Sequence, residues 1–170
     1  TTKNDNSPTI LIGTSGYAYN EWMEAGFYPP GTGTARMLPH YARVFPVTEI
    51  NYTWYQMPRA EAMDRMRRKA PEEFRFAAKL TRTLTHEVDP KGWPAQAALY
   101  REGIAPLVQS GQLLAVLVQL PPFFRRNPQN RRYLAKLLDA LAGLPLTAGF
   151  FGKFFLFTAA ASQGMYLLVF

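Results

Sequence analysis

Short apolar runs alternate with helical patterns along the first 143 residues of the chain. The run from Thr9 to Gly13 is rich in branched side chains and ends in glycine, which is typical of a buried strand. Similar runs lie at 47–51, 74–79 and 113–120. Between and after them, apolar residues return every three or four positions, and this spacing predicts helices at 38–45, 60–69, 95–109 and 127–143. The third of these helices contains Pro106, so we expect it to bend or break there.

Strands that alternate with helices, and that are apolar almost throughout, indicate a parallel sheet covered by helices. A closed barrel of eight strand–helix units takes about 250 residues, whereas this chain has 170. The pattern therefore predicts an α/β fold that is either an open, doubly wound sheet or an incomplete barrel.

Polar residues end each predicted strand, where ligands of α/β sheets bind. Glu49 and Lys79 end the second and third strands, and a carboxylate beside an amine suits general acid–base chemistry. Alternation along the strands places both on one face of the sheet with Asn51 and Gln119. A structural ion pair between neighbouring strand ends is the alternative interpretation of Glu49 and Lys79.

Further candidates lie in the loops after the strands. Ser15 and Tyr17 follow the first strand, and Tyr55 belongs to a group of aromatic residues that could stack on a ligand or simply pack the loops. His86, in the loop after Lys79, could act as an acid or a base. One other histidine in the chain is too few for a histidine-rich metal site, so we expect no metal and no cofactor.

Composition and charge limit the classes of protein to which this chain can belong. A hydrophobic fraction of 48% predicts one folded domain, and the absence of cysteine is compatible with the cytoplasm. A net charge of +7 favours polyanions, but carboxylates are interspersed with the basic cluster at 65–69, as on a solvated helix face. Nucleic-acid binding therefore remains an alternative. The segment 144–170 carries only one charged residue. Its apolar stretch is shorter than the about 20 residues that a membrane-spanning helix needs, so we expect no membrane span.

Several motifs stand in a fixed order along the chain. They are Gly13-Thr14-Ser15-Gly16-Tyr17, Glu49-Ile50-Asn51, Phe74-Arg75-Phe76 with Lys79, Thr85-His86, and Gln119-Leu120-Pro121-Pro122-Phe123. Together they resemble the DUF72 family, also called YecE-like proteins. The resemblance implies a TIM-barrel-like (β/α) fold in bacterial and archaeal cytosolic proteins of no established activity, and here an incomplete barrel of about four to six units. The family's signature residues fall at Ser15, Glu49, Asn51, Lys79, His86 and Gln119.

The resemblance covers about residues 9–146. Beyond Leu146 the family would continue with a fifth strand that bears an acidic residue, followed by Phe-Arg-His, but here Thr147 begins a stretch rich in phenylalanine. We interpret this as a frameshift or truncation near Leu146. A barrel cut short in this way would expose a sheet edge and self-associate.

The sequence thus predicts a disordered tail at 1–8, a DUF72-like domain at 9–146 and an atypical hydrophobic segment at 147–170. We expect a strand-end pocket for a small polar or anionic ligand, with acid–base chemistry. The alternatives are a basic nucleic-acid-binding module and an inactive remnant, and the sequence does not decide whether the protein is an enzyme. The expected catalytic residues are Glu49, Lys79 and His86, and the expected ligand-binding residues are Ser15, Tyr17, Asn51, Tyr55 and Gln119.

Overall fold

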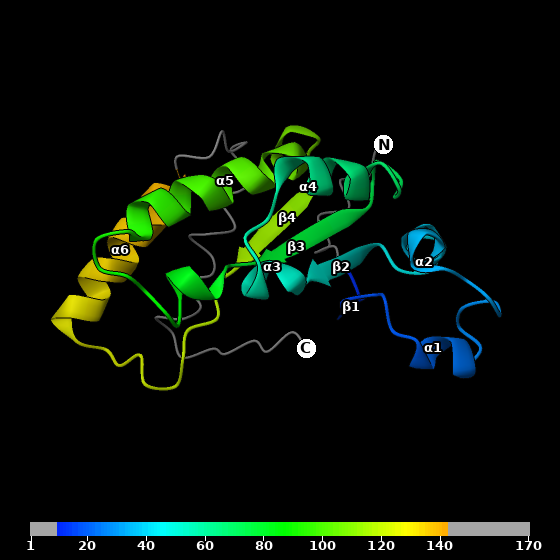
Figure 1. Cartoon of the computed structure of the whole chain (residues 1–170), viewed down its shortest axis with the longest axis horizontal. Coiled ribbons are helices and arrows are strands. Elements are labelled where there is room, and N and C mark those ends of the chain that lie inside the picture. The colour runs from blue at the N-terminus through cyan, green and yellow to red at the C-terminus, as the bar shows by residue number, and fades with distance from the viewer. Residues whose placement is uncertain (1–9, 143–170) are drawn as a thin grey trace, which may run out of the picture.

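A parallel sheet flanked by helices makes up residues 10–142, the part of the chain that the computed structural model describes (Figure 1). The predicted α/β class and the parallel strands are confirmed for this range. The tail at 1–8 and the segment at 147–170 lie outside it. The strands are β1 (Gly13–Ser15), β2 (Val47–Ile50), β3 (Arg75–Lys79) and β4 (Leu113–Leu117), in the sheet order β1-β2-β3-β4. The helices are α1 (Glu21–Glu24), α2 (Thr34–Tyr41), α3 (Tyr52–Tyr55), α4 (Ala60–Arg67), α5 (Trp93–Gln109) and α6 (Pro128–Ala142), with a 3-10 turn η1 (Arg82–Leu84).

The core lies between one face of the sheet and the helices. Ile50 and Phe76 pack into a cluster with residues of α2, α4 and α5, and Ala78 packs into a second cluster with α5 and α6. Figure 1 shows α4 and α5 lying along this face. Because side chains alternate along a strand, Glu49 and Lys79 project from the other face. The helices thus cover one face and leave the charged strand-end residues on the other.

Strand β1 begins later than the apolar run at 9–13 predicts. Val47, the first residue of β2, pairs with Gly13, and Pro46 before it has no N–H to extend the ladder. Ile10 and Ile12 therefore precede the strand and are 81% and 69% exposed. At Gly13 the two strands are so close that an added Cβ would lie 1.9 Å from the Val47 carbonyl oxygen.

A tyrosine hydroxyl joins β1 to β2. The Thr14 amide donates a hydrogen bond of 2.8 Å to the Tyr41 hydroxyl, which in turn donates one of 3.0 Å to the Val47 carbonyl. Tyr41 is fully buried and its ring packs against Phe45, with 4.9 Å between the ring centroids. The side chain of α2 therefore forms part of the connection between two strands.

The predicted helices are present with altered ends. Helix α5 continues through Pro106, so the expected break is wrong. Proline has no N–H to donate to the carbonyl of Glu102, four residues earlier. Because Glu102 is exposed, water can bind that carbonyl instead. Asn127 caps α6, because its Oδ1 accepts a hydrogen bond of 2.8 Å from the Asn130 amide. Strand β4 ends at Leu117 rather than at residue 120. Among residues 10–142, no helix combines the length and the apolar character that crossing a membrane requires.

Candidate functional site

Glu49 and Lys79 meet at the carboxyl ends of neighbouring strands. Glu49 is in register with Ala77 of β3, which places Lys79 one step further along the same face. The Lys79 ammonium lies 3.8 Å from a Glu49 carboxylate oxygen, and the two side chains are 20% and 22% exposed. The structure thus brings these two predicted residues together, partly shielded from water.

Two hydroxyl groups hold the backbone beneath this pair. The Thr53 hydroxyl lies 2.6 Å from the Lys79 carbonyl oxygen and 2.8 Å from that of Ile50, and the Tyr100 hydroxyl donates a hydrogen bond of 3.1 Å to Lys79. Burial raises the pKa of Tyr100, so its hydroxyl remains a donor. Sequence reasoning missed Thr53 and Tyr100, although a threonine soon after a strand is a usual capping signal.

Ser15 and Asn51 connect the ends of β1 and β2. The Asn51 side-chain amide donates a hydrogen bond of 2.6 Å to the Ser15 hydroxyl. Because Ser15 pairs in register with Glu49, this contact lies on the same end of the sheet as the ion pair. Both residues expose polar atoms there and can contact a ligand without rearrangement of the strands.

His86 and Tyr55 lie at two ends of one aromatic group. The His86 ring packs edge-on against Trp54, with 5.2 Å between centroids, and Trp54 packs edge-on against Tyr55 at 4.7 Å. The His86 Nδ1 lies 3.0 Å from the Thr85 hydroxyl, and Tyr55 is 68% exposed. This group (Trp54, Tyr55 and His86), which we call the aromatic corner, combines a ring that can stack on a ligand with an imidazole.

Tyr17 and Gln119 are placed differently from the other candidates. The Tyr17 ring packs against Tyr41 with 6.0 Å between centroids, and burial raises its pKa. Its carbonyl accepts a hydrogen bond from the Tyr28 hydroxyl, so Tyr17 forms part of the aromatic packing around α2. Gln119 is exposed in the loop two residues beyond β4. A ligand contact by either residue remains a prediction.

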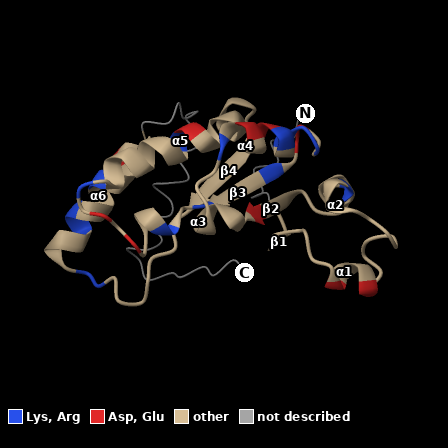
Figure 2. Ribbon diagram, viewed as in Figure 1, with Lys and Arg blue, Asp and Glu red and all other residues tan. Residues whose placement is uncertain are grey.

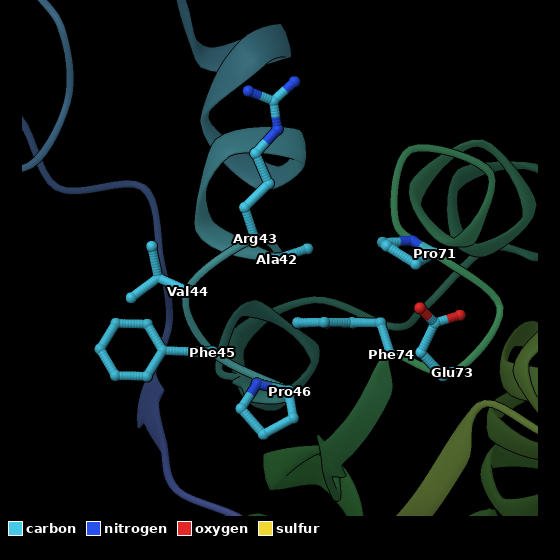
Figure 3. Close-up of a pocket in the computed structure, with 8 residues that line it drawn as sticks. All are labelled: Ala42, Arg43, Val44, Phe45, Pro46, Pro71, Glu73 and Phe74. Atoms are coloured by element: carbon cyan, nitrogen blue, oxygen red, sulfur yellow. The ribbon is translucent and has the colours of Figure 1, made fainter.

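A shallow cavity of about 220 Å³ lies at the opposite end of the strands. Its lining comes from the segments just before β2 and β3, and Figure 3 shows the Arg43 guanidinium extending beside α2, apart from the Glu73 carboxylate. In TIM-like barrels this amino-terminal end serves stability, whereas ligands bind at the carboxyl end. The Glu49 and Lys79 end is therefore the candidate site.

Helix α4 carries both acidic and basic residues (Figure 2). In α4, the Asp64 carboxylate bonds Arg67 at 2.7 Å and Arg68 at 2.8 Å. The hydrogen bond from Arg68 is the main reason that the pKa of Asp64 is lowered. One carboxylate thus engages two of the basic residues that suggested a polyanion-binding surface.

Comparison with known proteins finds uncharacterised relatives along most of the chain. The chain is 25% identical over 145 residues to UPF0759 protein YunF of Bacillus subtilis, and 28% identical over 135 residues to UPF0759 protein YecE of Escherichia coli. These matches cover 83% and 79% of this chain but 50% and 45% of the relatives, so the chain spans about half the length of the curated relatives that it matches.

A second similarity is confined to a short stretch. NADH-quinone oxidoreductase subunit N of Phocaeicola vulgatus is 47% identical over 47 residues, which are 28% of this chain and 10% of that protein. A match of this extent carries no argument about the fold or the site in residues 10–142.

The fold is also similar to that of solved structures. The crystal structure of a DUF72 family protein from Thermotoga maritima is 29% identical to the chain, with a TM-score of 0.63 over 76% of this chain and 51% of that one. The similarity is consistent with a TIM-barrel-like arrangement of the strands and helices. A family model described as "Protein of unknown function DUF72" matches residues 11–162, a range that extends beyond Leu146. The chain therefore belongs to the DUF72 family, whose function is unknown.

Proposed function

We propose that the carboxyl end of the sheet binds a small anionic ligand through Lys79, with Glu49 as its proton-accepting partner. The observation that carries this proposal is the position of the ion pair, which lies on the sheet face away from the helices and at the end where α/β sheets bind ligands.

The neighbouring groups support a ligand of this kind. Thr53 and Tyr100 fix the main chain of Lys79, so a bound anion would meet an ammonium whose attachment point is already in place. The Ser15 hydroxyl and the Asn51 amide supply hydrogen-bonding groups at the same end. The long side chain of Lys79 can turn from the Glu49 carboxylate towards an incoming anion, leaving the carboxylate to accept a proton from the ligand.

The test measures binding of inorganic phosphate and malonate by isothermal titration calorimetry. We expect saturable binding to the unmodified chain, at least tenfold weaker binding to Lys79→Ala, and retention of binding in Lys79→Arg, which keeps the positive charge. The matched control is Arg82→Ala, because Arg82 forms an exposed ion pair of 3.3 Å with Glu87. This control should bind as the unmodified chain does.

A second variant separates a ligand site from a structural ion pair. Glu49→Gln removes the negative charge beside the ammonium, so binding of phosphate should become tighter if Lys79 is an anion receptor. If the pair serves only to hold β2 to β3, the same change lowers thermal stability and leaves phosphate binding undetectable. Unchanged binding in Lys79→Ala, or failure of that variant to fold, would overturn the site assignment.

A further inference from the structure

The aromatic corner lies beside Lys79 at the carboxyl end of the sheet. Trp54 follows Thr53, whose hydroxyl lies 2.6 Å from the Lys79 carbonyl oxygen. Figure 1 shows α3, which carries Trp54 and Tyr55, next to the ends of β2 and β3. His86 stands in the loop after β3, and its ring packs against Trp54. The loops that follow two neighbouring strands therefore meet at this corner.

The hydroxyl of Thr85 determines which nitrogen of His86 carries the proton. Thr85 is buried, and it donates its single hydroxyl hydrogen to the Thr81 carbonyl oxygen, 3.2 Å away. The same hydroxyl lies 3.0 Å from the His86 Nδ1, so at this contact its oxygen accepts and Nδ1 donates. A neutral imidazole has one N–H, so the lone pair is then on Nε2. His86 thus presents a hydrogen-bond acceptor on the side of the ring away from Thr85.

The turn that carries His86 is held by its own main chain. The Arg82 carbonyl oxygen accepts hydrogen bonds of 2.8 Å from the amides of His86 and Glu87. The side chains of Arg82 and Glu87 form an ion pair of 3.3 Å across the same turn. A group whose backbone is already fixed loses little freedom when a ligand binds. The imidazole is therefore in place before a ligand arrives.

Tyr55 provides the flat surface of the corner. Its ring is nearly perpendicular to that of Trp54, with an interplanar angle of 86°, and the residue is 68% exposed. Aromatic rings attract one another in offset-stacked or edge-on arrangements, so an exposed tyrosine ring offers a surface to a planar group of a ligand. The corner combines this surface with the acceptor of His86.

We propose that the aromatic corner binds the planar ring of an anionic ligand, and that this ring carries a hydrogen-bond donor such as a phenolic hydroxyl. The ring packs on Tyr55, the donor bonds Nε2 of His86, and the anionic group binds Lys79. The chemical class is a hydroxylated aromatic carboxylate. This inference rests on the proposed anion site at Lys79 and names the kind of ligand which that site takes. Thr85 is a positioning residue, because it acts through the imidazole.

Isothermal titration calorimetry compares benzoate with 3-hydroxybenzoate and 4-hydroxybenzoate. We expect at least one hydroxybenzoate to bind about fivefold more tightly than benzoate, the gain from one added hydrogen bond. Tyr55→Ala should weaken the binding of all three carboxylates about fivefold and leave phosphate binding unchanged, whereas Tyr55→Phe, which keeps the ring, is the matched control. Lys79→Ala should weaken the binding of the carboxylates and of phosphate alike, at least tenfold.

Nuclear magnetic resonance tests the protonation of His86 in the free protein. Long-range proton–nitrogen spectra at about pH 8, where imidazoles are ordinarily neutral, show which ring nitrogen carries the hydrogen. His40 is the other histidine of the chain, so His86→Gln assigns the signals. We expect the hydrogen on Nδ1 of His86.

Substitutions of Thr85 connect this protonation to binding. Thr85→Val should lose the preference for Nδ1 and lower the affinity for hydroxybenzoate to that for benzoate. Thr85→Ser, which keeps the hydroxyl, should behave as the unmodified chain does. A merely structural role of Thr85 would change stability but neither the protonated nitrogen nor the ratio of the two affinities.

Four results would overturn the inference. They are a hydrogen on Nε2 of His86 in the unmodified chain, hydroxybenzoates that bind no more tightly than benzoate, unchanged carboxylate binding by Tyr55→Ala, and tighter binding of glucuronate, which has a sugar ring, than of either hydroxybenzoate. Any of these together with phosphate binding that depends on Lys79 would overturn the inference and leave the proposed function standing. Absence of binding by phosphate and by every carboxylate would overturn both.

Discussion

Replacing Tyr41 with phenylalanine tests whether one hydroxyl connects β1 to β2. The substitution removes the atom that accepts from the Thr14 amide at 2.8 Å and donates to the Val47 carbonyl at 3.0 Å. The ring itself remains, and its contact with Phe45 is unchanged. The hydroxyl also lies 2.9 Å from the Thr14 hydroxyl. The variant therefore isolates the contacts of the Tyr41 hydroxyl with Thr14 and Val47 from the packing of a fully buried side chain.

The magnitude follows from the groups left without partners. A net hydrogen bond is worth about 1 kcal/mol, and a buried group that loses its partner costs about 1–3 kcal/mol. Val47 is buried, whereas Thr14 is half-buried on an edge strand, where water can replace part of the loss. We therefore expect Tyr41→Phe to lower the free energy of unfolding by about 2–3 kcal/mol.

Urea denaturation followed by circular dichroism measures this difference. The midpoint should fall while the dependence on urea stays the same, because the surface exposed on unfolding hardly changes. Tyr55→Phe is the matched control: Tyr55 is 68% exposed, and removal of its hydroxyl should change stability by less than about 0.5 kcal/mol. If Tyr41→Phe is as stable as Tyr55→Phe, the hydroxyl does not hold the strands together and the reasoning fails.

The remaining predictions concern β1, alkaline stability, nucleic acid and the coding locus. Gly13→Ala should destabilise the fold by more than about 2 kcal/mol in the same urea assay, because its Cβ would lie 1.9 Å from the Val47 carbonyl oxygen. Burial raises the pKa of Tyr133 to about 12, above the value near 10 of an unfolded chain, so stability should fall as the pH rises from about 10 to 12. The fall should be smaller in Tyr133→Phe, and equal slopes would contradict this account. Because Asp64 engages Arg67 of α4 and Arg68 just after it, we expect no DNA complex in a gel-shift assay at about 50 mM salt; a complex that weakens steeply with salt would support the nucleic-acid alternative. Sequencing across the codon for Leu146 tests the frameshift hypothesis: we expect an acidic residue followed by Phe-Arg-His in another frame, and an uninterrupted frame that lacks this pattern would contradict the hypothesis.

Much of the fold follows from patterns that operate over a few residues. The apolar runs predict the four strands found within residues 10–142, and the period of two explains why Glu49 and Lys79 project from the same face. Their meeting also depends on β2 and β3 being neighbours and on the register that pairs Glu49 with Ala77, both of which the structure supplies. The start of β1 is predicted less well. It depends on the hydrogen bonds to β2, which begin at Val47 because Pro46 has no N–H to donate.

The parts that sequence reasoning missed depend on contacts between distant residues. Tyr100 reaches Lys79 across 21 positions and Thr53 reaches it across 26, and no local pattern encodes either contact. Tyr17 is predicted to bind a ligand because it follows a strand; its packing against Tyr41 of α2 could not be predicted in this way, and its ligand contact stays a prediction. Residue type and position in the chain do not show which residues lie beneath Lys79 and which pack around α2. The positions of the helices in the fold determine this.

The support beneath Lys79 has a consequence for how this site can change. Thr53 and Tyr100 bind the main chain at position 79, not the ammonium. Every amino acid has that carbonyl, so another residue could occupy the position while the strand end keeps its place. The side chain at position 79 can therefore change while the hydrogen bonds from Thr53 and Tyr100 to its main chain remain. A protein built in this way can acquire a different chemistry by a single substitution, with its architecture inherited intact.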